Sequence, residues 1–178
     1  MLRLQSEDGT NRLTRACLQA LTKAVRDLAE DNASLVIAGN SHFYSAGADL
    51  EEIAALKAPD AYQFSKMGQT LMDTIASFRA FVIAAIEGYC MGGGLDLALA
   101  CHYRIASPHA IFGHRGAALG LITGWGGTQR LPRLIGRGRA LELLIAAEKI
   151  QAAQALRFGL VDSMVADPVK EALWRCRQ

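Results

Sequence analysis

The sequence predicts an α/β protein with buried, largely parallel strands, and two features carry this prediction. Short uninterrupted apolar runs at 35–38 and 81–86 have the length and composition of strands that are covered on both faces. Longer segments with helical periodicity separate such runs, and strands that alternate with helices are typical of parallel α/β sheets. There is no internal repeat and no linker, so residues 1–178 are expected to form one domain.

Each expected element follows from apolar periodicity and from the residues that end it. Apolar residues at every third or fourth position predict helices, and short apolar runs that end at glycine, asparagine or proline predict strands. In the first half of the chain we expect a helix over 13–28, a strand over 35–38, a loop over 41–48, the acid-rich start of a helix at 49–52 and, after a break at Pro59, a helix over 61–78. In the second half we expect a strand over 81–86, a turn through Gly88, a helix over 95–100 after Gly92–Gly94, strands at 103–106 and 111–112, two helical stretches around 128–147, a helix over 151–158 and a strand over 160–165.

Composition and charge exclude several classes of protein. Nineteen Lys+Arg against 17 Asp+Glu give a net charge of +2 without a basic stripe, so no nucleic-acid partner is expected. The run Phe81–Ile86 is far shorter than the roughly 20 residues that span a bilayer, so no membrane partner is expected. The four cysteines (Cys17, Cys90, Cys101 and Cys176) form no C-x-x-C pair, which predicts no structural metal and favours a reducing cytoplasm.

Two loops with small residues follow the two buried strands, one at Ala46–Asp49 and one at Gly92–Asp96. Ligands of parallel sheets bind beyond the carboxyl ends of strands, where helix N-termini present free N–H groups. Small residues let a ligand oxygen approach the backbone closely. Two N–H donors from separate loops can converge on one oxygen, which is the geometry of an oxyanion hole. Tight helix–strand packing is the alternative explanation of the glycines.

Four motifs follow one another along the chain: SAGADLEEI (45–53), AAIEGYCMGGGLDLALACHYRIAS (84–107), FGHRGAALGLITGWGGTQRLPRLIG (112–136) and GLVD (159–162). Together they resemble the crotonase superfamily, which is the enoyl-CoA hydratase/isomerase family. The resemblance implies a crotonase-like spiral of repeated ββα units, the ClpP/crotonase fold. It also implies a substrate bound as a coenzyme A thioester, with no cofactor bound permanently.

The resemblance further assigns roles to individual residues. The N–H groups of Ala48 and Gly93 would form an oxyanion hole for the thioester carbonyl and stabilise an enolate, and Asp96 would be the catalytic carboxylate. The residues expected to bind the substrate are Ala46, Ala48, Asp49, Leu50, Tyr89, Gly92, Gly93, Arg115, Gly116, Leu119 and Gly124.

The chain departs from the hydratase pattern at its two catalytic glutamates. The first falls on Asp96 and the second on Gly116, which has no side chain. Adding water between two carboxylates needs one as base and one as acid, so ordinary hydratase activity is in doubt and isomerase-type proton transfer is possible. Asp96 resembles the dienoyl-CoA isomerase branch and Gly116 the dihydroxynaphthoyl-CoA synthase branch, each only in part. A non-catalytic acyl-CoA-binding relative, or a decarboxylase or thioester hydrolase of the superfamily, remains an alternative.

Five side chains near these motifs have two interpretations each. Asp96 is either a helix first-turn acid or a general acid–base, and Asp49 is either a helix cap, which we favour, or a ligand contact. We interpret His102 as structural and Trp125 as a packing residue. His114 is interpreted as structural, with catalysis as the alternative.

The two ends of the chain also differ from the pattern of the family. Relatives usually begin with a β-hairpin before the segment matching 8–14, and they end with helices that close the acyl pocket and build a trimer. We therefore expect a truncated N-terminal hairpin and a C-terminal helical region that is short or absent. The assembly implied by the resemblance is a homotrimer or a dimer of trimers.

Overall fold

The computed structural model describes residues 1–31 and 33–178, and within them the strands form three sheets. The largest sheet is wholly parallel and has the order β1 (Leu2–Arg3), β3 (Leu35–Ala38), β6 (Val82–Ile86), β8 (Tyr103–Ala106) and β11 (Ser163–Met164). The second has the order β10 (Lys149–Gln151), β9 (Ile111–Gly113), β7 (Tyr89–Met91) and β4 (Phe43–Ser45), with β10 antiparallel to β9. A short parallel pair joins β2 (Arg12–Leu13) and β5 (Gly47–Ala48).

One repeated step along the chain builds the two larger sheets. β3, β6 and β8 lie side by side in the first sheet, and each is followed by a strand of the second sheet, β4, β7 and β9 respectively. Helices then follow each pair: α2 (Leu50–Ala54) with α3 (Ala58–Ala76), α4 (Gly93–Ala100), and α5 (Gly127–Ile135). The expected spiral of ββα units is confirmed.

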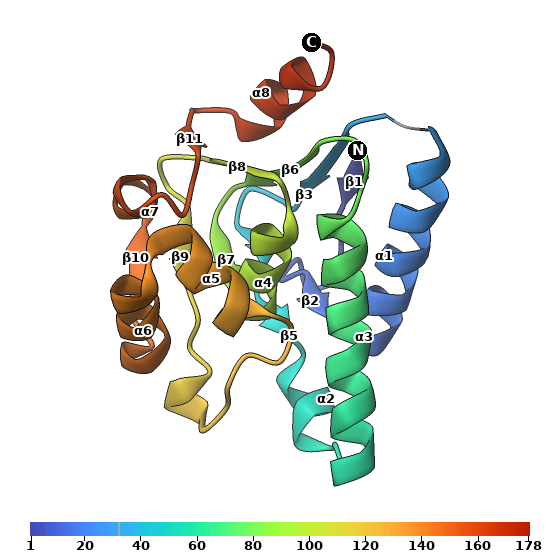
Figure 1. The fold of residues 1–178 in the computed structure, drawn as a ribbon, viewed down its shortest axis with the longest axis vertical. Helices are drawn as coiled ribbons and strands as arrows, with labels where there is room; N and C mark the ends of the chain where they lie inside the picture. Colours follow the sequence, from blue (N-terminus) through green and yellow to red (C-terminus); the bar gives the residue numbers. More distant parts are fainter. Residues whose placement is uncertain (32) are drawn as a thin grey trace.

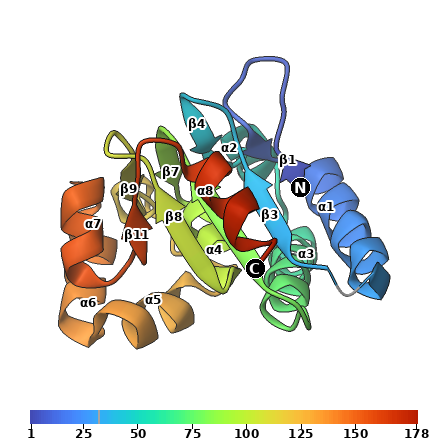
Figure 2. The same cartoon turned by 90° about the horizontal axis from the view of Figure 1, so that it is seen from above.

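The remaining helices flank the sheets (Figures 1 and 2). α1 (Arg15–Leu28) lies beside α3 on one flank, and α5, α6 (Arg137–Ala146) and α7 (Ala152–Phe158) lie on the opposite flank. α8 (Pro168–Arg175) packs against β3, β6 and β8, and two short 3-10 turns occur at η1 (Ala29–Asp31) and η2 (Ala117–Leu119). Across the described ranges, none of the helices has the length and hydropathy needed to cross a membrane.

The central strands are buried on both faces, as the uninterrupted apolar runs predicted. In β3, Leu35 and Ile37 belong to the main core, whereas Val36 and Ala38 face the small cluster that contains Ala172 of α8. Side chains alternate between the two faces of a strand, so a strand that is covered on both faces carries mostly apolar residues.

Several elements differ from the expectation, and three of the differences are the largest. The predicted loop over 41–48 contains β4 and β5, which are too short to show a period of their own. The helix expected from residue 61 begins at Ala58, because Pro59 sits in the first helical turn, where no N–H is needed, instead of breaking the chain. The strand expected over 160–165 is reduced to Ser163–Met164.

Candidate active site

A cavity of about 560 Å³ opens where the second sheet meets the first turns of α2 and α4. Its wall is mostly apolar and is completed by α3 and by the segment between β9 and α5. Asp49 is absent from this wall. Every other residue predicted to bind or transform a substrate lines it: Ala46, Ala48, Leu50, Tyr89, Gly92, Gly93, Asp96, Arg115, Gly116, Leu119 and Gly124.

Glycines let two backbone segments touch in this wall. At Gly47, whose φ is +97°, a Cβ would lie 2.9 Å from the amide nitrogen of Gly93. A Cβ on Gly93 would lie 3.2 Å from the amide nitrogen of Ala48. The amide groups of Ala48 and Gly93 are therefore neighbours. Since Gly93 is the first residue of α4, its N–H has no partner inside the helix.

Trp125 is buried and fixes the spacing of these segments. A Cβ on either Gly68 or Gly93 would collide with its indole ring. The ring centroid also lies 5.4 Å from that of Phe64, in a tilted aromatic contact. The packing role predicted for Trp125 is confirmed, and the same side chain also lines the cavity.

Asp96 lies in the first turns of α4 and is 2% exposed. Its Oδ2 accepts a 2.6 Å hydrogen bond from Oγ1 of Thr123 and lies 3.6 Å from Nε2 of His114. Its Oδ1 is close enough to Gly127 that a Cβ there would collide with it. Asp96 therefore sits near the N-terminus of α4 and beside the first residue of α5.

At Gly116, the position of the second expected glutamate, the surrounding loop leaves no space for a side chain. A Cβ on Gly116 would lie 2.9 Å from the carbonyl oxygen of Leu121. The Gly116 carbonyl in turn accepts hydrogen bonds from the amides of Leu119 and Leu121, at 2.8 and 2.9 Å. This tight loop leaves no room for a side chain at 116 unless the loop shifts.

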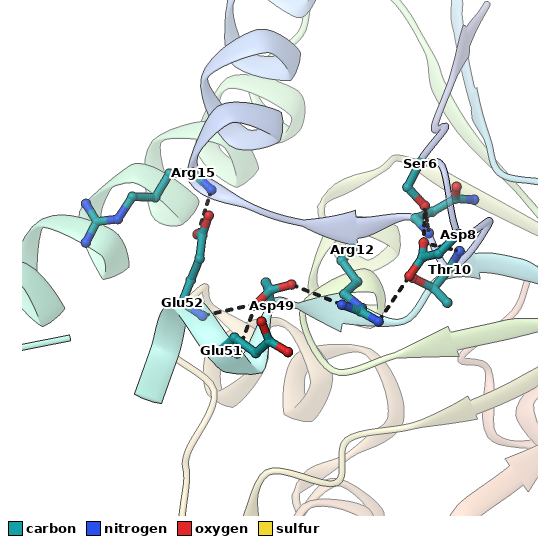
Figure 3. A network of polar contacts seen from close by, with 9 residues as sticks. Ser6, Asp8, Thr10, Arg12, Arg15, Asp49, Glu51 and Glu52 are labelled. Atoms are coloured by element: carbon teal, nitrogen blue, oxygen red, sulfur yellow. Dashed lines mark hydrogen bonds and ion pairs between the residues drawn. The ribbon is translucent and has the colours of Figure 1, made fainter. Parts of the chain in front are cut away.

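Asp49 acts as a helix cap, as our favoured interpretation predicted. Its side chain accepts hydrogen bonds from the amides of Glu51 and Glu52, at 2.9 and 3.0 Å. Figure 3 shows how the network continues through Arg12, which lies 3.4 Å from Asp49 and 3.0 Å from Asp8. The hydrogen bond from the Glu52 amide, helped by Arg12, lowers the pKa of Asp49.

Sequence reasoning missed part of the site. Thr123 is the hydrogen-bond donor to Asp96, but it lies 27 positions away and no local pattern links the two. Apolar residues of α2, of α3 and of the connection between them were also missed: Ile53, Leu56, Ala61 and Phe64. Helical periodicity places Phe64 on the buried face of α3, and this signal could have found it.

The charged groups of the cavity wall are few. Among the described residues, Asp96 is its acid, and Arg115 and Lys149 are its permanent cations. Lys149 also lies 5.1 Å from the ring centroid of Tyr89. Within the same part of the chain, no group of three or more His, Cys, Asp or Glu side chains is arranged to hold a metal ion.

A family model and a curated relative both match this chain, and both belong to the same family. The whole chain, residues 1–178, matches the family model described as enoyl-CoA hydratase/isomerase. A Bacillus subtilis (strain 168) protein described as a probable enoyl-CoA hydratase is 44% identical over 155 residues, which are 85% of this chain and 60% of that protein. The chain therefore spans about 60% of the length of this curated relative.

Solved structures match over nearly the whole chain. Pseudomonas aeruginosa DspI superposes with a TM-score of 0.94 at 36% identity, covering 98% of this chain and 68% of DspI. An enoyl-CoA hydratase from Bacillus anthracis superposes with a TM-score of 0.93 at 36% identity, covering 98% of this chain and 70% of the hydratase.

Proposed function

The chain belongs to the enoyl-CoA hydratase/isomerase family, and from this premise we propose that it transforms the acyl group of a coenzyme A thioester through an enolate. The cavity would receive the acyl group, and the N–H groups of Ala48 and Gly93 would bind the thioester oxygen. Coenzyme A arrives with the substrate, and no resident cofactor enters the proposal. Assembly as a homotrimer or a dimer of trimers remains a prediction.

The observation that carries the proposal is the close approach of two backbone segments in one cavity wall. The amide nitrogen of Ala48 lies 3.2 Å from the place where a Gly93 Cβ would sit, and this proximity supports the proposal that both amides donate to one oxygen. An N–H donor that binds an oxyanion in the transition state is worth about 3–4 kcal/mol. Such donors act on charge that develops at the thioester oxygen, whatever product follows.

Asp96 is the proposed proton-transfer group. It is a buried carboxylate on the wall of the same cavity, and Thr123 holds one of its oxygens. In the proposed step, Asp96 takes a proton from the α-carbon, and the C–H electron pair moves onto the thioester oxygen. Return of the proton to another carbon of the acyl group relocates the double bond, which is isomerase chemistry.

A second candidate function is binding of an acyl-CoA without turnover. Gly116 favours it, because the loop through Leu121 leaves no room for the second carboxylate that ordinary hydration requires. A decarboxylase or thioester hydrolase is a further alternative, since an oxyanion hole and one polar group can support either reaction.

The test is hydrogen exchange at the α-carbon. The chain is incubated in deuterated water with a panel of acyl-CoA thioesters, and deuterium uptake is read by mass spectrometry. Uptake is expected for at least one thioester, because enolate formation releases the α-proton. Binding without uptake would instead support the non-catalytic function. Release of free coenzyme A would support a thioester hydrolase, and release of carbon dioxide would support a decarboxylase.

The variant Asp96→Asn tests whether Asp96 is the group that takes the α-proton. Asparagine keeps an oxygen that can accept the hydrogen bond from Thr123, but it cannot take a proton. We expect uptake to fall by about a hundredfold or more while acyl-CoA affinity changes by less than about threefold. Unchanged uptake in this variant would remove Asp96 from the mechanism.

A further inference from the structure

Two polar atoms buried beside the cavity have no hydrogen-bond partner among the described residues. They are Nε2 of His114 and Oδ1 of Asp96. The side chains of His114 and Asp96 are only 8% and 2% exposed. Buried polar atoms are nearly always paired in folded proteins, so these two need an explanation. Both residues line the cavity, which points to a role toward a ligand.

The imidazole of His114 lies between Asp96 and the closed position 116. Its Nε2 is 3.6 Å from Oδ2 of Asp96. Its Nδ1 is 3.5 Å from the place that a Cβ on Gly116 would take. A titratable ring therefore stands next to the position where the hydratase pattern has its second glutamate.

His102 shows how a structural histidine is held in the same fold. Its Nδ1 accepts a 2.9 Å hydrogen bond from the Val82 amide, and its Nε2 lies 3.3 Å from the Ala76 carbonyl. Both ring nitrogens are thus used by the backbone, and the structural interpretation of His102 is confirmed. Nε2 of His114, by contrast, has a carboxylate beside it and, among the described residues, no hydrogen bond.

We propose that His114 is a second catalytic residue, which works with Asp96 as an acid–base pair that adds water to an enoyl thioester. This inference rests on the proposed function, because water addition passes through the same enolate. The 3.6 Å gap between Nε2 and Oδ2 exceeds a hydrogen bond, but catalytic contacts are often long without substrate and shorten when it binds. Thr123 fixes Oδ2, the oxygen of Asp96 closest to this contact.

The proton and electron balance of the step is simple. The step begins as the protonated ring of His114 passes its Nε2 proton to Oδ2 of Asp96. Nε2 then takes one proton from water as the water oxygen bonds to the β-carbon. The C=C electron pair moves to the bond between the α-carbon and the carbonyl carbon, and the C=O π pair moves onto the thioester oxygen. Asp96 gives its proton to the α-carbon as the C=O bond re-forms, and the pair returns to its starting state. The product is a 3-hydroxyacyl thioester.

The experiment compares water addition with α-proton exchange in the 178-residue chain. Hydration of but-2-enoyl-CoA is followed in ¹⁸O-labelled water by mass spectrometry, and exchange is followed on a saturated acyl-CoA in deuterated water. His114→Gln keeps a polar side chain that cannot carry a proton between groups. We expect it to lower hydration by about a hundredfold or more and exchange by less than about threefold. His109→Gln is the matched control, because His109 is exposed and lies outside the cavity, and it should change neither rate.

Each remaining outcome has a defined meaning. Hydration that persists in His114→Gln overturns the pair, and so does a wild-type chain that exchanges the α-proton but adds no water. Both of these results leave the proposed function intact. Parallel loss of both reactions in His114→Gln, with acyl-CoA binding retained, would also overturn the pair, because His114 would then serve the enolate and not the water. Absence of both reactions in the wild-type chain would refute the proposed function itself.

Discussion

At the scale of single residues, the site depends on how one buried carboxylate is held. Removing the hydroxyl of Thr123 in Thr123→Val would leave Oδ2 of Asp96 without its hydrogen-bond donor. We expect the free energy of unfolding to fall by about 1–3 kcal/mol, because a buried charge loses its partner, and α-proton exchange to slow as well. Urea unfolding and the exchange assay measure the two effects.

The matched control for that change is Thr70→Val. Thr70 is exposed, and its hydroxyl donates to the carbonyl of Lys66 in its own helix. The same chemical change should alter unfolding there by about 0.5 kcal/mol or less. Equal losses at Thr70 and Thr123 would mean that the hydrogen bond to Asp96 contributes nothing of its own.

Gly93 offers a second test at this scale. In Gly93→Ala the new methyl group would collide with the Trp125 ring and crowd the amide of Ala48. We expect a loss of about 1–3 kcal/mol in unfolding free energy and a large loss of exchange activity, since the two amides would be forced apart. Gly138→Ala is the control, because nothing lies within 4 Å of its Cβ position in α6, and it should stabilise the chain by about 0.5–1 kcal/mol. Full activity in Gly93→Ala would argue against an oxyanion hole at this place.

At the scale of elements, the sequence predicted the helices and strands that are marked by a pattern among neighbouring residues. The long helices and the two central strands were predicted because a buried helix face gives apolar residues a regular spacing, and a buried strand gives an uninterrupted apolar run. β4 and β7 were missed because three-residue strands carry no period, and their pairing joins Phe43 to Tyr89 across the chain. Pro59 misled the prediction, because a proline in the first helical turn resembles a break when only the sequence is read.

The candidate site likewise has parts that the sequence could predict and parts that it could not. Small residues after buried strands predicted the neighbourhood of Ala48 and Gly93, since that signal is local. The hydrogen bond from Thr123 to Asp96 and the collision that keeps residue 127 a glycine arise only when α4 meets α5 and the segment before it. Contacts of this kind depend on tertiary packing and leave no spacing rule to follow.

The cap of α2 connects an element to binding. α2 places Leu50 and Ile53 on the cavity wall, and its first turn is held by the two hydrogen bonds to Asp49. In Asp49→Ala the helix should lose about 1 kcal/mol, and acyl-CoA affinity should fall by up to about fivefold. Amide hydrogen exchange of residues 50–54 and a binding titration measure these effects.

The variant Asp49→Asn separates capping from ligand contact. Asparagine caps helices as well as aspartate does, so helix stability and affinity should both recover. An affinity that stays low in Asp49→Asn would show that the charge of Asp49 contacts the ligand. That result would restore the substrate-binding role predicted for it from the sequence.

At the scale of the whole molecule, one arginine joins the last strand of the large sheet to the strand beside it. Arg104 of β8 is 5% exposed and donates to the carbonyls of Cys101 and Leu160, at 2.8 and 3.0 Å. Its Nη2 lies 2.7 Å from Oδ2 of Asp162, and the same oxygen accepts the Arg104 amide at 2.8 Å. Asp162 immediately precedes β11, which pairs with β8, so the path of the chain toward α8 depends on this contact.

Substitution of Arg104 should therefore affect the stability of the entire fold. Arg104→Met keeps the apolar stem but removes the donor of two carbonyls and the cation beside Asp162, whose Oδ2 keeps only the amide of residue 104, and we expect a loss of about 3–5 kcal/mol in unfolding free energy. Asp162→Asn keeps an oxygen that can accept both hydrogen bonds, so its loss should be smaller, at about 1–3 kcal/mol. Urea unfolding followed by tryptophan fluorescence reads both the core, through Trp125, and α8, through Trp174. If Arg104→Met changed only the signal of Trp174, the arginine would anchor α8 alone, and the claim that it supports the whole sheet would be wrong.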